Sequence, residues 1–220
     1  IIMSIENKKT VEIYKEKANT YLEISIKHDK LDTEKAINKR KKLNNFLKES
    51  FKSLPENSKI LEIGAADGVN SKYLESLGYN VTASDIAEDF ISASKNNGLN
   101  TIKFNILEDN FNEKYSGILA WRVFVHFTEE DIFDALNKSY ENLETNGILV
   151  FNVINRETRD VDNEWVDFSN EYHMGVERYY NYFSKETLDN IILKTNFKIQ
   201  DFHTEGGDNN NKWLVYVLKK

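Results

Sequence analysis

The chain has 220 residues with 29 basic and 36 acidic side chains. This length suits one α/β domain. The formal net charge of −7 disfavours a protein that binds duplex nucleic acid by neutralising phosphates. The absence of cysteine excludes disulfides, thiolate metal sites and thiol nucleophiles. No apolar run approaches the roughly 20 residues of a membrane helix, so we expect a cytoplasmic protein with no membrane partner. We also expect no bound metal.

The first elements in the chain are two amphipathic helices. Apolar residues recur at intervals of three and four over residues 11–27 and again over residues 43–54, which is the spacing of one helix face. Pro55 follows, and proline cannot continue a helix. The sequence therefore predicts a helical N-terminal segment over residues 1–55 and a second unit over residues 56–220.

Strands and helices alternate in the second unit. Short apolar strands are expected at residues 59–63, 80–83, 101–104, 115–120 and 147–154, and helices at residues 69–77 and 87–95 and from Thr128. Parallel strands joined by right-handed crossovers produce this alternation. The fold class is therefore α/β, with helices on both faces of a mostly parallel sheet.

The final third follows a different pattern. Residues 155–183 are polar and aromatic without a clear period, which is typical of a lid or binding insert. Ser184 then opens a helix to residue 195, and strands are expected at residues 197–203 and 212–218. A short link rich in glycine and asparagine joins them, as in an antiparallel hairpin. The expected sheet therefore has seven strands.

Residues 60–68 read Ile-Leu-Glu-Ile-Gly-Ala-Ala-Asp-Gly, a buried strand that turns sharply into a helix. Glycine suits such a turn because the backbone bends tightly and a ligand approaches the main chain without meeting a Cβ atom. The start of the helix then offers free N–H groups to an anionic part of that ligand. A turn that binds nothing has the same sequence pattern, so the loop alone decides little.

Asp85 makes the glycine loop more informative. It lies 23 positions after Glu62, at the end of the next expected strand. Neighbouring parallel strands end at the same edge of a sheet, so its carboxylate should lie beside the loop, where it can accept hydrogen bonds from a ribose diol. Asp85 also has the position of a cap for the helix near Ala87, and the two roles are compatible. The loop and the acid together predict a nucleoside cofactor.

The spacing of the glycines separates two cofactor classes. A dinucleotide fingerprint requires glycines at positions 64, 66 and 69, where the chain has Gly64, Ala66 and Val69. A spacing of G-x-G-x-G is met by Gly64 and Gly68, and Ala66 departs from it by one methyl group. The long helical segment before the loop and the terminal hairpin also disfavour a nicotinamide enzyme.

These features resemble a class I S-adenosylmethionine-dependent methyltransferase. The resemblance covers roughly residues 59–220 and rests on residues 62–68, Asp85, residues 104–106 and 115–126, the turn at Asn146 and Gly147, and the hairpin. It implies a Rossmann-like sheet, with S-adenosyl-L-methionine as cofactor and S-adenosyl-L-homocysteine as product. The front helices resemble the lid that many members carry. The sequence departs from the family at Ala66, at Asn105 where an acid is common, and at Ser116 where aspartate is frequent.

The resemblance also implies which residues bind the cofactor. The glycine loop would hold its methionine end above Glu62, Asp85 would bind the ribose, and Ala120 would face the methionine part. Two tyrosines of the first helix either close over the cofactor or only pack in the core. The implied cofactor-binding residues are Glu62, Gly64, Ala65, Ala66, Gly68, Asp85, Ile86, Asn105, Ile106, Ala120, Tyr14 and Tyr21.

The turn after the fourth strand lies beside the transferring methyl group in family members. His126 is therefore a candidate base for a substrate hydroxyl or amine, and the alternative is a histidine that only bonds to the backbone. Candidates for substrate binding come from this turn, the aromatic insert and the hairpin: Arg122, His173, Arg178, Tyr179, Tyr180 and Trp213.

The expected reaction is methyl transfer from a sulfonium to an oxygen or nitrogen of a small-molecule acceptor, by a monomer or homodimer. The absence of cysteine and the single proline exclude the thiol-adduct and Pro-Pro-Tyr routes to nucleic-acid bases. Two alternatives stay open: a nicotinamide-dependent reductase and a non-catalytic regulator that binds S-adenosylmethionine.

Overall fold

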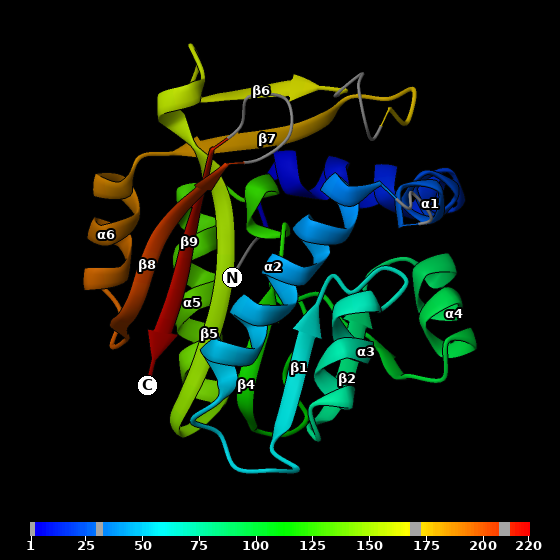
Figure 1. Ribbon diagram of the computed structural model, residues 1–220. Coiled ribbons are helices and arrows are strands. Elements are labelled where there is room, and N and C mark those ends of the chain that lie inside the picture. Colours follow the sequence, from blue (N-terminus) through cyan, green and yellow to red (C-terminus); the bar gives the residue numbers. More distant parts are fainter. Residues whose placement is uncertain (1–2, 30–32, 168–172, 207–211) are drawn as a thin grey trace.

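The computed structural model describes residues 3–29, 33–167, 173–206 and 212–220 (Figure 1). Seven of its strands lie side by side in the order β3 (Asn100–Lys103), β2 (Asn80–Asp85), β1 (Lys59–Ile63), β4 (Tyr115–Ala120), β5 (Leu143–Asn155), β9 (Lys212–Lys219) and β8 (Lys198–Gly206). The first five are parallel, and β9 runs antiparallel to both β5 and β8. The predicted sheet with its terminal hairpin is confirmed.

Within the described part of the chain, the sheet has nine strands rather than the predicted seven. The aromatic insert supplies the other two, β6 (Asn163–Val166) and β7 (Arg178–Phe183), which lie across the top of the molecule in Figure 1. β7 pairs in parallel with the last two residues of β5 and antiparallel with β6. All six residues of β7 are buried, so polar and apolar positions do not alternate along it. No strand was predicted in this insert, so the predicted number of strands was wrong.

Helices cover both faces of the sheet, as predicted. α3 (Val69–Ser76) and α4 (Glu88–Asn96) form the first two crossovers, and α5 (Glu129–Asn142) and α6 (Lys185–Leu193) come later in the chain. On β4, Ile118 packs in the cluster that includes α5 and α6, whereas Leu119 packs in the cluster with Leu74 of α3. None of the helices among the described residues has the length and apolar character needed to span a membrane.

Two long helices precede β1. α1 (Ile5–Asp29) begins six residues before the predicted start, and α2 (Glu34–Phe51) begins nine residues before. Thr33 caps α2 by accepting a hydrogen bond from the Ala36 backbone N–H at 3.2 Å. The last turn of α2 places Leu47 and Phe51 in the core against the sheet. Its first half is almost entirely polar, so it has no apolar stripe from which its start is predictable.

The N-terminal end of α1 is fastened to the start of α5. The Ser4 backbone N–H and Oγ donate to the carboxylate of Asp131, at 3.2 and 2.5 Å. The same carboxylate accepts from the Thr128 backbone N–H, which completes a capping box. Asn7 adds a bond from Nδ2 to the carbonyl oxygen of His126 at 3.3 Å. One buried acid therefore caps α5 and holds α1 in place.

We expect Asp131→Ala to lower the free energy of unfolding by about 2 kcal/mol, because several hydrogen-bond donors lose their acceptor. Urea unfolding followed by circular dichroism measures the change. Glu130→Ala is the matched control, since Glu130 is exposed in the same turn. Equal stability losses in the two variants would contradict this account of the contact.

Candidate functional site

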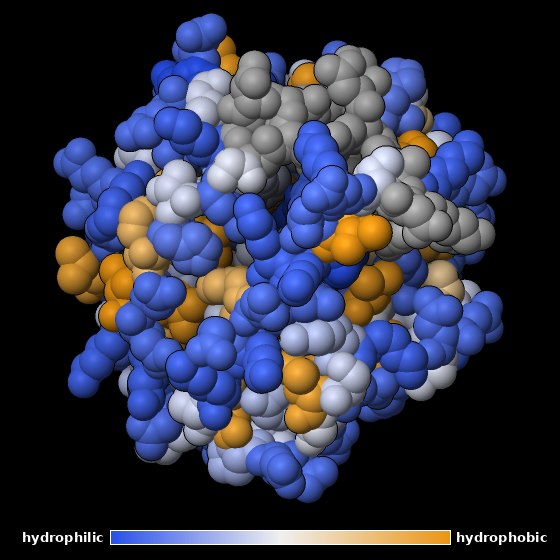
Figure 2. Space-filling model, viewed as in Figure 1, coloured by the Kyte–Doolittle hydropathy of each residue, from blue (hydrophilic) through white to orange (hydrophobic). Residues whose placement is uncertain are grey.

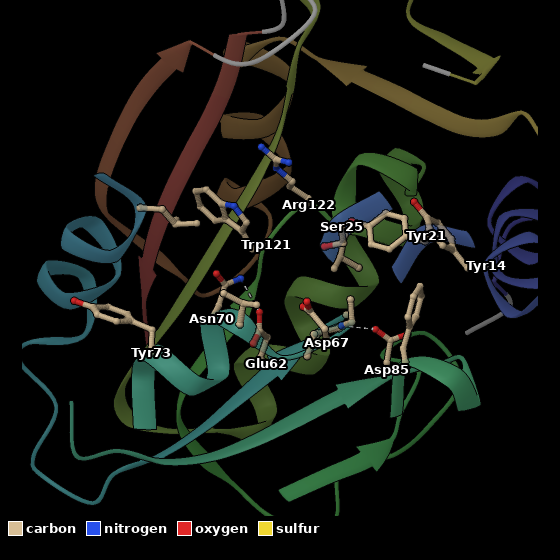
Figure 3. A pocket seen from close by; sticks show the side chains of 18 of the residues that line it. Tyr14, Tyr21, Ser25, Glu62, Asp67, Asn70, Tyr73, Asp85, Trp121 and Arg122 are labelled. Carbon is tan, nitrogen blue, oxygen red and sulfur yellow. Dashed lines mark hydrogen bonds between the residues drawn. The ribbon is translucent and has the colours of Figure 1, made fainter. Parts of the chain in front are cut away.

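A cavity of about 1100 Å³ opens where the parallel strands end. Its floor is formed by the loop after β1 and by the residues that follow β2 and β3. α1 contributes Tyr14 and Tyr21, α2 contributes its first three turns, and the loop after β4 contributes Trp121 and Arg122 (Figure 3). The two front helices and the carboxyl edge of the sheet therefore enclose one common space.

The loop after β1 has a left-handed backbone at three positions. The φ angles are 68° at Gly64, 49° at Ala66 and 82° at Gly68. A Cβ on Gly64 would lie 2.4 Å from Val123 Cγ2, and one on Gly68 would lie 2.1 Å from Leu99 Cδ1. These two positions therefore require glycine for both backbone conformation and packing. Ala66 adopts a conformation that costs an L-residue about 1 kcal/mol.

Glu62 ties the end of β1 to α3. Its side chain accepts hydrogen bonds from Asn70 Nδ2 at 2.9 Å and Ser71 Oγ at 2.5 Å. Burial raises the pKa of Glu62 to about 7, although these bonds act in the opposite direction. Asn70 also accepts a bond from Arg40 of α2 at 3.0 Å. The glycine loop is therefore held from below, and α2 is connected to the same network, as Figure 3 shows in part.

Asp85 holds the loop from the side. One carboxylate oxygen accepts from the Ala66 backbone N–H at 2.9 Å, and the other accepts from Ile86 N–H at 2.7 Å and Ala87 N–H at 3.4 Å. Only 5% of Asp85 is exposed, and burial raises its pKa to about 6. The carboxylate thus contacts both the glycine loop and the start of α4, where Ala87 is the N-cap residue. Its binding of a ribose stays a prediction.

Three aromatic rings stand beside Asp85 in the cavity wall. Tyr14, Tyr21 and Phe90 of α4 lie with ring centroids 5.5 to 6.4 Å apart. The two tyrosines therefore pack against a neighbouring helix and also line the cavity. Their contact with the cofactor stays a prediction.

His126 is buried behind Tyr14. Its Nδ1 lies 2.6 Å from the carbonyl oxygen of Tyr179, so this nitrogen carries the proton. Nε2 lies 3.0 Å from the Tyr14 hydroxyl and accepts from it, while Arg178 donates to the same hydroxyl at 3.2 Å. Burial lowers the pKa of His126 to about 3, so the ring is neutral at physiological pH. The histidine therefore has the expected backbone bond, and it also lines the cavity beside Tyr14.

The remaining predicted cofactor residues are placed as follows. Ile86, Asn105 and Ile106 line the cavity near Phe90. Asn105 also closes its own turn, since its Oδ1 accepts from the Leu107 backbone N–H at 3.1 Å. Ala120 is fully buried in the core cluster with α5, and the next residue, Trp121, takes the place on the cavity wall.

Of the six candidates for substrate binding, the structure brings Arg122 to the cavity wall. The side chains of Arg178, Tyr179, Tyr180 and Trp213 are buried behind it. His173 is exposed and lies 2.8 Å from the Asp167 carboxylate. These five residues do not line the cavity among the described part of the chain.

Several other residues of the wall were not predicted from the sequence. The largest group lies on the polar half of α2, which has the appearance of a solvated helix face, and the others come from α1, α3, α4 and the loop after β4. They include Asn7, Thr10, Lys35, Lys39, Arg40, Lys41, Asn44, Asn70, Tyr73, Phe90 and Trp121. Their shared location follows from the packing of α2 over the strand ends.

Comparison with known proteins identifies the family. A family model described as a methyltransferase domain matches residues 36–201. The chain belongs to this methyltransferase family. Over 95 residues, or 40% of the chain, it is 30% identical to a probable S-adenosyl-L-methionine-dependent methyltransferase, TehB, from Haemophilus influenzae (strain 10810). That match spans 33% of the relative's length.

Solved methyltransferases share the fold. Magnesium protoporphyrin IX methyltransferase (ChlM) from Synechocystis PCC 6803 with bound SAM matches with a TM-score of 0.72 at 10% identity, covering 100% of both chains. A S-adenosylmethionine-dependent methyltransferase from Clostridium acetobutylicum ATCC 824 matches with a TM-score of 0.68 at 16% identity, covering 91% of this chain and 98% of the other. The predicted methyltransferase family is confirmed by the family model, and its Rossmann-like fold by these structures. The relative and the two solved structures are described as depending on or binding S-adenosylmethionine, the cofactor predicted for this chain.

We expect Ala66→Gly to raise the free energy of unfolding of the methyltransferase by about 0.5 to 1 kcal/mol. Glycine removes the left-handed strain, and the greater entropy of the unfolded chain offsets part of that gain. Urea unfolding measures the change. Ala65→Gly is the matched control, because Ala65 has no positive φ and loses a buried methyl group. A stability loss in Ala66→Gly as large as in the control would show that the loop is not strained.

Proposed function

We propose that this domain transfers a methyl group from S-adenosylmethionine to an oxygen or nitrogen of a small-molecule acceptor. The observation that carries the proposal is the bond between the Ala66 N–H and the Asp85 carboxylate, at the floor of a cavity that α1 and α2 cover. This bond joins the glycine loop to the acid that we predict to bind the nucleoside.

The residues of the cavity fit the parts of the cofactor. The loop at 64–68 would hold the amino-acid end, and Arg40 of α2 lines the same cavity. Asp85 already accepts three hydrogen bonds, and a carboxylate accepts about four, so one acceptor position is left for a ribose hydroxyl. Ile86 and Ile106 offer apolar contacts for the adenine, and the Asn105 side chain lies at the same end. Each part of the cofactor therefore finds a chemically matching side chain.

When bound, S-adenosylmethionine supplies an electrophilic methyl group on a positively charged sulfur. The chain itself aligns the two reactants and excludes water, which are the main contributions that such a transfer requires. α1 and α2 cover the cavity for this purpose. The floor acids Glu62 and Asp85 have raised pKa values, and a bound cation favours their charged forms.

Tyr14 and His126 are suited to accept the proton of the acceptor. The Tyr14 hydroxyl lines the cavity and donates to His126 Nε2, so it can pass its proton inward while it accepts another. The lowered pKa of His126 makes it a weak base, and the rate contribution we expect is at the low end for general bases, about 10²-fold.

We expect Asp85→Asn to weaken S-adenosylhomocysteine binding by about 2 kcal/mol, roughly 30-fold, because a charged acceptor for the ribose is lost. Asparagine keeps one oxygen for the Ala66 N–H, so the loop keeps its support. Titration calorimetry measures the affinity. Glu88→Gln, a charge-matched change at the exposed start of α4, should bind like the original protein.

The same protein tests the competing functions. S-adenosylhomocysteine should raise the unfolding midpoint, with a stabilisation that grows as the logarithm of one plus its concentration over Kd, and NADH should not. Stabilisation by NADH alone would favour the reductase. A domain that binds S-adenosylmethionine but transfers no methyl group to any small-molecule acceptor would be the regulator.

We expect His126→Ala and Tyr14→Phe each to slow methyl transfer by about 10²-fold, since both interrupt the same proton path. Affinity for S-adenosylhomocysteine should change little in His126→Ala. Steady-state rates with the best acceptor found, and calorimetry for binding, measure the two quantities. Unchanged turnover in both variants would remove the pair from the mechanism.

A further inference from the structure

Two buried hydrogen-bond donors belong to Asn152 of β5 and to Arg122 in the loop after β4. Asn152 is fully buried, and its Oδ1 accepts from the Arg122 backbone N–H at 2.7 Å. Its Nδ2 has no hydrogen-bond partner among the described residues, and neither has the buried Nε of Arg122. A buried donor without an acceptor costs about 1 to 3 kcal/mol. The two residues are joined by a hydrogen bond, and Arg122 lines the cavity, so an acceptor group of a ligand beside Arg122 would supply a missing partner.

The backbone of Arg122 supports this interpretation. Its φ angle is 62°, a left-handed conformation that is costly for any residue other than glycine. Strain of this kind persists where the surrounding structure imposes it, and functional sites are common examples. Here it directs the guanidinium over the Trp213 ring at 5.1 Å, while the residue lines the cavity. The guanidinium is therefore held in a fixed plane.

The cavity wall contains charges of both signs, and Arg122 lies across the space from the floor acids. Glu62, Asp67 and Asp85 belong to the floor, and Figure 3 shows Arg122 on the other side of the space. The first turns of α2 add Lys35, Lys39, Arg40 and Lys41 to the wall, on a molecular face that Figure 2 shows to be mostly hydrophilic. The chain as a whole has a net charge of −7. This wall is therefore a local region of positive charge that attracts anions to the cavity.

The space beside Arg122 also has an apolar part. Trp121, Leu43 and Tyr73 line the same cavity. The volume of about 1100 Å³ slightly exceeds the range of roughly 300 to 1,000 Å³ typical of a site for one drug-sized ligand. A second, partly apolar molecule therefore has room next to the cofactor.

We propose that the methyl acceptor is a partly apolar molecule with a carboxylate or phosphate group, and that this anion binds at Arg122 Nε and Asn152 Nδ2. The inference rests on the proposed methyltransferase function. It assigns Arg122 and Asn152 to acceptor binding, while the floor acids and the glycine loop serve the cofactor.

Titration calorimetry of the protein saturated with S-adenosylhomocysteine tests the proposal. The probes are benzoate, phenyl phosphate and benzamide, which share one ring and differ in charge. At least one anion should bind 10-fold or more tightly than benzamide, and the stronger of the two identifies the group as carboxylate or phosphate. Equal or absent binding of all three would overturn the proposal.

Two variants locate the site. Asn152→Asp keeps an oxygen for the Arg122 N–H but replaces the Nδ2 donor with an acceptor, so anion binding should fall at least 10-fold. Arg122→Gln should also lower anion binding at least 10-fold, because it removes the Nε donor and the charge. Glutamine keeps an unbranched polar side chain at the strained position. Lys42→Gln is the matched control, because Lys42 is exposed on α2 and does not line the cavity. An equal loss in Lys42→Gln would indicate general charge attraction and contradict the site.

Cofactor binding separates this proposal from the function on which it rests. Both site variants should keep their affinity for S-adenosylhomocysteine within about 3-fold. A loss of that affinity with unchanged anion binding would assign the two donors to the cofactor's carboxylate and overturn the proposal. If the unaltered protein fails to bind S-adenosylhomocysteine, the proposed function fails. The same titrations on the cofactor-free protein then decide the anion site alone.

Discussion

The bond from the Ala66 N–H to the Asp85 carboxylate fixes the geometry on which the site depends. A left-handed loop has few internal hydrogen bonds, so its position is set by what it contacts. Asp85 accepts a hydrogen bond from the middle of the loop, and Glu62 accepts two from α3, the helix that follows the loop. Both acids are buried, and in both cases burial favours the neutral form. The floor of the cavity is thus formed by acids whose charge depends on what occupies the space above them.

Much of the architecture was predictable because the central strands are short, apolar and separated by helices of ordinary length. β1 and β4 have the predicted bounds, and the glycine loop and Asp85 lie together as their spacing indicated. The family resemblance added the cofactor to this local chemistry. These features depend on residues that are close in sequence or on neighbouring strands, where simple rules apply.

Other features were not predictable for physical reasons. β7 is buried on both faces, so it lacks the alternation that reveals a strand. The polar half of α2 resembles a solvated helix face, and only its packing over the strand ends makes it part of the cavity. Ala120 has the expected position in sequence, but its methyl group points to the core instead of the cavity. Tertiary packing decides all three cases, and a single sequence contains no direct record of it.

The anchoring of α1 has a consequence for the order of events during synthesis. Its partners Asp131, His126 and Tyr179 are separated from their bonded residues by 127, 119 and 169 positions. At about 5 to 20 residues per second, the first helix leaves the ribosome on the order of ten seconds before the partners exist. It therefore spends that interval without its docking surface, and α1 can reach its final place only after the chain up to Tyr179 has been made.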